Sequence, residues 1–109
     1  MSGEQPSASE VYETSRFTKA LNKLDKKTQA DIEDAIEEII ANPLIGEQKK
    51  GALKYLRVHK TKSGPTEYLL GYNWDEGRLT IHLLQVGPHE NYYRDAESRR
   101  KSDLKFISE

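Results

Sequence analysis

Two basic side chains, Arg57 and His59, lie two residues apart in a run that alternates apolar and polar residues. Residues two apart on a β-strand project from the same face, so we expect both side chains to share one surface. A third candidate, His89, follows the last apolar run of the chain, where a loop can present it. Histidine both donates and accepts protons near neutrality, because its ordinary pKa is about 6.5. These residues therefore predict metal-free acid–base chemistry.

Cleavage of RNA through its own 2′-hydroxyl group needs little more than such a set. One group removes the hydroxyl proton, a second protonates the leaving 5′-oxygen, and a cation stabilises the charge on the phosphorane. The neighbouring lysines Lys49 and Lys50 could add phosphate contacts. Each residue also has a simpler interpretation, as a solvated lysine pair or as ordinary exposed residues of a strand. On spacing alone, the simpler interpretation is the commoner one.

Other kinds of site find little support in the residue types. The chain has no cysteine, which excludes disulfides and thiolate chemistry. His89-Glu90 begins like a zinc-binding helix, but Tyr93 stands where a second histidine is needed. We therefore predict no metal site and no cofactor. His82 lies within an apolar run, which favours a hydrogen-bonded core or interface histidine.

Length and charge set further bounds. The 109 residues fit one domain, and no apolar run is long enough to cross a membrane. The formal net charge is −1, yet residues 43–72 carry six bases against two acids. A polyanion could dock on this segment, although charge alone favours a solvated lysine-rich loop and edge strand. We expect a soluble protein of the cytoplasm.

The first half of the chain predicts a helical hairpin after a short strand over residues 10–14. A helix opened by Thr14 or Ser15 buries one apolar stripe, and a second helix capped by Asp25 buries another before Asn42-Pro43 ends it. The two stripes consist of Phe17, Ala20, Leu21 and Leu24, and of Ile32, Ala35, Ile36, Ile39 and Ile40. Neither helix can bury its stripe alone, so a sheet must cover them.

The second half predicts that sheet, with strands over residues 53–61, 67–74 and 79–86 joined by short turns. The last strand is apolar on both faces, as is typical of a central strand. A polar, weakly docked helix follows over residues 90–105. We thus predict an α+β fold, with an N-terminal helical hairpin packed on a small, mainly antiparallel sheet and a short C-terminal helix. Residues 1–9 form a disordered tail, 10–97 the domain, and 98–109 a polar tail.

Four sequence blocks, in this order of elements, resemble one protein family. They are NPLIG at 42–46, LRVHK at 56–60, YLLGY at 68–72 and GPHENYYRD at 87–95. Over roughly residues 10–97 the chain is similar to the RelE/ParE superfamily of type II toxins. The resemblance implies the fold predicted above.

For function, the resemblance to the RelE-like, histidine-using branch implies a ribosome-dependent mRNA endonuclease. Such enzymes cleave messenger RNA without metal, leaving a 2′,3′-cyclic phosphate and a 5′-hydroxyl, and so inhibit translation. By position in the motifs, Arg57, His59, His89 and Tyr93 would form the catalytic set, with Tyr92 as the alternative register for Tyr93. The residues expected to bind RNA are Lys49, Lys50, Lys54 and Arg94.

The expected partners are a cognate antitoxin protein, the ribosome and mRNA, with no membrane and no small-molecule cofactor. The antitoxin would cover apolar helical grooves or displace the residues after Tyr93. Two alternatives remain open: a ParE-like inhibitor of DNA gyrase, and a non-catalytic module that only binds an antitoxin or another partner. The nuclease hypothesis requires Arg57, His59 and His89 to converge on one solvent-facing patch.

Overall fold

The structure, a computed structural model, describes residues 7–109. Residues 1–6, which belong to the predicted disordered tail over 1–9, lie outside the described residues. The strands are β1 (Glu10–Glu13), β2 (Glu47–Gln48), β3 (Arg57–Ser63), β4 (Thr66–Asp75) and β5 (Thr80–Pro88). The helices are α1 (Ser15–Asn22), α2 (Lys26–Ala41), the 3₁₀ turn η1 (Gly51–Leu53), α3 (Tyr92–Ser98) and α4 (Arg100–Ser108).

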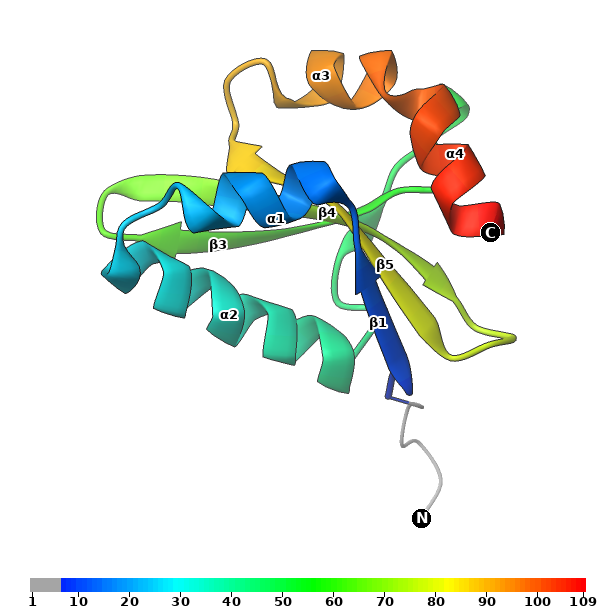
Figure 1. Cartoon of the computed structure of the whole chain (residues 1–109), viewed down its shortest axis with the longest axis horizontal. Coiled ribbons are helices and arrows are strands. Elements are labelled where there is room, and N and C mark those ends of the chain that lie inside the picture. The colour runs from blue at the N-terminus through cyan, green and yellow to red at the C-terminus, as the bar shows by residue number, and fades with distance from the viewer. Residues whose placement is uncertain (1–6) are drawn as a thin grey trace.

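The five strands form one sheet in the order β1-β5-β4-β3-β2 (Figure 1). β1 pairs in parallel with β5, and the other three pairings are antiparallel. The predicted short strand near residue 10, the mainly antiparallel sheet and the central position of β5 are therefore confirmed. β5 bulges at Leu84, because Gly71 pairs with Gln85 whereas the next residue, Tyr72, pairs with Leu83.

α1 and α2 cover one face of the sheet, which we call the α1/α2 face (Figure 1). The predicted stripes are buried or half-buried there, against Leu70, Tyr72 and Leu83 of the sheet. Thr14 caps α1 as predicted, because its hydroxyl accepts from the amide of Phe17 at 3.0 Å. α2 ends at Ala41, directly before Asn42-Pro43.

α3 and α4 lie against the opposite face, the α3/α4 face, where a second apolar cluster forms. Its buried members are Leu53, Leu56, Val58, Leu69, Leu84, Tyr92 and Ala96. A glycine is needed beneath α3, because a Cβ on Gly71 would lie 2.5 Å from the Tyr92 hydroxyl oxygen. That hydroxyl donates to the Gln85 carbonyl at 2.9 Å, so the glycine lets α3 lie close to the sheet.

The strand predicted from residue 53 begins only at Arg57. The reason is local: Gly51 has a φ of 67°, and the amide of Lys54 donates back to the Gly51 carbonyl at 3.2 Å. Such a left-handed residue starts a turn, which suits glycine because it has no Cβ. The alternation within the strand is as predicted from Leu56 onwards, with Leu56 and Val58 on one face.

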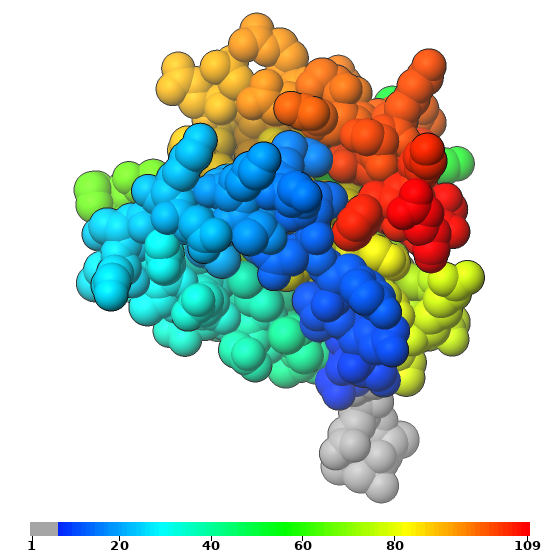
Figure 2. Space-filling view, viewed as in Figure 1, coloured from blue at the N-terminus to red at the C-terminus, as the bar shows by residue number. Residues whose placement is uncertain are grey.

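The chain ends differ from the prediction. Ala8 and Ser9, placed in the disordered tail, donate backbone hydrogen bonds to Ile40 and Leu79. Residues 98–109, predicted as a polar tail, contain helix α4, whose Phe106 and Ile107 pack against the α3/α4 cluster. The space-filling view shows the end of α4 beside β1 (Figure 2).

Candidate functional site

Arg57 and His59 share one face of β3, as the alternation predicts, and that face is the one α2 covers. Arg57 Nη1 donates to the carbonyl of Gly46, in the link after α2, at 2.7 Å. His59 Nε2 lies 3.0 Å from Glu38 Oε1 of α2, and the histidine side chain is only 14% exposed. Both residues therefore connect the sheet to α2 and to the link that follows it.

His89 lies on the opposite side of the sheet, in the turn between β5 and α3. It is exposed, and its carbonyl accepts from the amide of Tyr92, which begins α3. Its imidazole contacts the ring of Tyr93 edge to face, with centroids 6.0 Å apart. Tyr93 in turn packs against the α3/α4 cluster, so both rings belong to the α3/α4 face.

The prediction that Arg57, His59 and His89 converge on one patch is wrong. Val58 is buried in the α3/α4 cluster, so its two neighbours on β3 must point to the α1/α2 face. His89 reaches the other face because the chain turns over the sheet edge into α3. The alternation of the strand correctly predicts that Arg57 and His59 share a face. Only the packing of α2 shows that this is the α1/α2 face.

Lys49 joins His89 and Tyr93 on the α3/α4 face. Its ammonium lies 5.1 Å from the centroid of the Tyr93 ring, a cation–π distance. The same ammonium donates to Glu47 Oε1 at 2.8 Å. This hydrogen bond and the nearby charge lower the pKa of Glu47, with smaller contributions from Lys60 and Lys50. The contact with Glu47 likewise raises the pKa of Lys49.

Sequence reasoning missed Glu47 and Lys60. Glu47 pairs with Val58, and Lys60 pairs with Leu69, so both side chains share the α3/α4 face with these apolar partners. The sequence could have placed Lys60 on this face, because neighbouring residues of a strand point to opposite faces and Lys60 follows His59. Glu47 was not, because β2 is two residues long and leaves no periodic signal. We call Glu47, Lys49, Lys60, His89 and Tyr93 the imidazole–lysine surface.

The other predicted residues are placed around this surface or away from it. Lys50 and Arg94 are exposed next to Lys49 and Tyr93 in the chain. Lys54 is also exposed, but it lines a separate groove together with Arg57. The two tyrosines are distinguished by burial: Tyr92 is 2% exposed, and burial raises the pKa of its hydroxyl strongly, whereas Tyr93 is half-buried. Tyr93 is thus the aromatic residue available at the surface.

Two properties of residues 7–109 bear on the kind of site. No helix among them is long and apolar enough to cross a membrane. No group of three or more histidine, aspartate or glutamate side chains in this part of the chain is arranged to hold a metal ion.

Comparisons with known proteins give a family and a fold. A family model described as the ParE-like toxin of type II bacterial toxin–antitoxin systems matches residues 11–97. No curated protein matches the chain.

Three solved structures of similar fold are distant from this chain in sequence. A mutant of the Escherichia coli toxin RelE in the free state has a TM-score of 0.68 at 18% identity, covering 89% of this chain and 98% of that one. The RelBE2 toxin–antitoxin complex of Mycobacterium tuberculosis gives 0.64 at 24% identity, covering 78% and 100%. The intact RelBE complex of E. coli gives 0.61 at 20% identity, covering 73% and 95%. These likenesses show a RelE-like fold.

Proposed function

Because this chain belongs to the ParE-like toxin family of type II bacterial toxin–antitoxin systems, we propose that it is a cytoplasmic mRNA endonuclease. It cleaves mRNA on the ribosome through the 2′-hydroxyl group and so inhibits translation. A cognate antitoxin holds it inactive. The antitoxin partner is supported by the toxin–antitoxin complexes among the structures of similar fold.

One observation carries the nuclease proposal: a continuous set of contacts on one face links a carboxylate, an ammonium, a phenol and an imidazole. Glu47 contacts Lys49, Lys49 lies over Tyr93, and Tyr93 contacts His89. They include the base, the acid and the cation that transesterification of RNA requires, and exposed Lys60 and Arg94 add further positive charge. The nuclease hypothesis in its first form fails, because it required Arg57 and His59 to converge with His89. The present proposal replaces the strand pair Arg57 and His59 with Glu47, Lys49 and Lys60.

The roles follow from the charge states. Glu47 is ionised at neutral pH, as an ordinary glutamate is, and it accepts the 2′-hydroxyl proton while the 2′-oxygen attacks phosphorus. The bond to the 5′-oxygen breaks, and His89 donates a proton to that leaving oxygen. Lys49 and Lys60 stabilise the negative charge of the phosphorane. Tyr93 stacks on a base beside the scissile bond, and the products are a 2′,3′-cyclic phosphate and a 5′-hydroxyl.

The test compares the two histidines. Translating ribosomes are supplied with a defined mRNA and the purified protein, and cleavage is followed by primer extension. We expect His89→Ala and Glu47→Gln each to lower the cleavage rate by a factor of about 10²–10⁴, as is usual for loss of one acid–base group. His59→Ala is the matched control, because it removes an imidazole from the opposite face, and we expect it to keep the wild-type rate within about threefold.

Three outcomes contradict parts of this proposal. Loss of cleavage in His59→Ala, with activity kept in His89→Ala, would return the site to the α1/α2 face. Growth arrest without RNA cleavage would favour the second candidate, inhibition of DNA gyrase, which the ParE-like description of the family supports. A protein that neither arrests growth nor cleaves RNA, yet binds an antitoxin, would be a non-catalytic binding module.

A further inference from the structure

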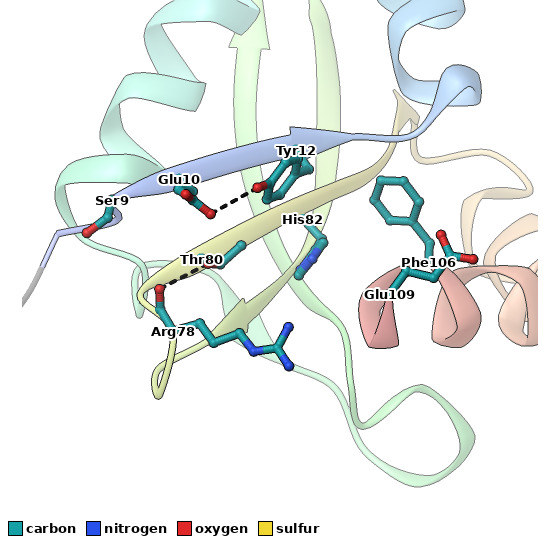
Figure 3. A pocket seen from close by; sticks show the side chains of 8 residues that line it. All are labelled: Ser9, Glu10, Tyr12, Arg78, Thr80, His82, Phe106 and Glu109. Carbon is teal, nitrogen blue, oxygen red and sulfur yellow. Dashed lines mark hydrogen bonds between the residues drawn. The ribbon is translucent and has the colours of Figure 1, made fainter.

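A cavity lies far from the imidazole–lysine surface, at the opposite end of β5. It has a volume of about 590 Å³, enough for a small organic ligand. β1, the start of β5 and the end of α4 enclose it (Figure 3). The residues that carry the argument are Glu10, Tyr12, Arg78, His82, Phe106 and Glu109, and we call this the β1/α4 cavity.

Three rings form its walls. Tyr12 and His82, neighbours on β1 and β5, stack with centroids 5.8 Å apart and planes 23° from parallel. Phe106 of α4 meets the His82 ring edge to face at 5.6 Å. Tyr12 is 50% exposed, so its ring is open to a ligand. Aromatic rings that converge in this way attract organic cations through their negative faces.

The charges favour a cation too. Glu10 and Glu109 supply two carboxylates against one guanidinium, that of Arg78. Arg78 already has a counter-ion, because its Nε lies 3.8 Å from Asp75 Oδ2. The Tyr12 hydroxyl donates to Glu10 Oε1 at 2.9 Å, which holds that carboxylate beside the aromatic wall.

His82 contributes a largely buried ring to the wall of the cavity. The residue is only 6% exposed, and its Nδ1 has no hydrogen-bonding partner among the described residues. Figure 3 shows the imidazole between Arg78 and Phe106. Burial lowers the pKa of His82, so the ring is neutral and keeps one nitrogen as an acceptor.

We propose that the β1/α4 cavity binds an organic cation: a guanidinium or ammonium group on a short aliphatic stem. Tyr12 and Phe106 contact the cation, Glu10 and Glu109 neutralise it, and the neutral ring of His82 forms part of the wall. The ligand can be a free small molecule or an arginine or lysine side chain presented by a protein. This site is independent of the proposed nuclease activity.

The binding experiment uses the full chain and NMR titration. The probes are agmatine, as a free guanidinium compound, and the blocked tripeptide acetyl-Gly-Arg-Gly-amide, with its citrulline analogue as a neutral control of the same shape. We expect saturable shifts confined to amides of β1, the start of β5 and the end of α4. The citrulline peptide should bind at least about tenfold more weakly, since hydrogen bonds to charged groups contribute about 1.5–3 kcal/mol.

Variants test the named contacts. Glu10→Gln, Tyr12→Leu and Glu109→Gln should each weaken binding of the better probe, by about tenfold for the carboxylates. Glu13→Gln is the matched control: it lies on β1, but its carboxylate accepts from Thr18 Oγ1 on the other side of the strand, so affinity should not change. Circular dichroism checks the fold, and Glu109→Gln lies at the end of the described chain, where it cannot disrupt the sheet.

The relative affinities of the two probes show whether the ligand is a free small molecule or a side chain of a protein. Tighter binding of agmatine supports a free cation, and tighter binding of the peptide supports a protein partner. The proposal is overturned if neither probe binds saturably or if the citrulline peptide binds as tightly as the arginine peptide. It is also overturned if the three variants bind the better probe with the affinity of the wild type.

Discussion

His82 is the one histidine of the chain that is buried, and its environment predicts a pH-dependent stability. Burial lowers its pKa below the ordinary 6.5, Asp75 opposes that shift, and Arg78 adds to it. Above about pH 7 the ring is neutral in both folded and unfolded chains and has no effect. As the pH falls below about 6.5, the unfolded chain binds a proton that the folded chain does not, so the free energy of unfolding decreases.

The measurement is urea unfolding between about pH 7.5 and pH 5.5, a window above the titration of ordinary carboxylates. His82→Phe keeps an aromatic ring between Tyr12 and Phe106, and we expect it to remove most of the loss of stability. His89→Gln, which removes an exposed histidine, should lose stability with pH as the wild type does. A wild-type slope in His82→Phe would show that another group titrates.

At the scale of elements, an ion pair between half-buried Arg16 and buried Asp103 holds α4. Arg16 of α1 donates from two nitrogens to the two carboxylate oxygens of Asp103, both at 3.0 Å, and from one of them also to Gln85 Oε1 at 3.1 Å. Asp103 is 2% exposed. Removing one partner of such a pair leaves the other charge unpaired, which costs up to about 3–5 kcal/mol when both are fully buried.

We therefore expect Asp103→Asn to release α4 while the sheet stays folded. Hydrogen exchange followed by mass spectrometry should show faster exchange in α4 (Arg100–Ser108) and unchanged protection in β4 and β5. Asp95→Asn, at an exposed aspartate of α3, is the control and should leave α4 protected. Equal exchange of α4 in wild type and Asp103→Asn would mean that Phe106 and Ile107 suffice to hold it.

The same helix shows where sequence reasoning stops. The sequence predicts the apolar stripes of α1 and α2 and the three long strands, because their apolar residues recur with the period of a helix or a strand. The anchor of α4 is a buried aspartate in a polar segment, which no pattern of apolar residues reveals. The turn at Gly51 likewise shortened a strand that alternation alone extends to residue 53. Tertiary contacts hold α4 in place and a local turn sets the start of β3, and the pattern of apolar residues predicts neither.

The candidate site was predictable only in part, for the same reason. His89, Tyr93 and Lys49 were found from residue types and motif, and the structure brings them together. The face of Arg57 and His59 depends on where α2 lies, which their own strand does not specify. Glu47 joins the surface through β2, a strand too short to be recognised.

Across the whole molecule, a net charge of −1 conceals two ends of opposite character. The imidazole–lysine surface presents Lys49 and Lys60. Lys62 lies on the same face of β3, because it is two residues beyond Lys60. The β1/α4 cavity, at the other end of β5, is lined by more carboxylates than cations. If the proposed function holds, we expect an RNA chain to be attracted to the first end of the protein and repelled from the second, although the total charge is close to zero.

This polarity makes a prediction about salt. Single-stranded RNA binding is measured against salt concentration in a His89→Ala background, so that the RNA stays intact. The affinity falls with salt because phosphate contacts release counterions, with a logarithmic slope of about 0.7 per contact on single strands. We expect Lys60→Ala to weaken binding and reduce the slope by about 0.7. Lys19→Ala, an exposed lysine on α1, should change neither quantity, because it faces away from the α3/α4 side. Equal slopes for Lys60→Ala and the parent would place the RNA on another surface, whereas a loss caused by Lys19→Ala would move the nucleic acid to the helical side of the sheet.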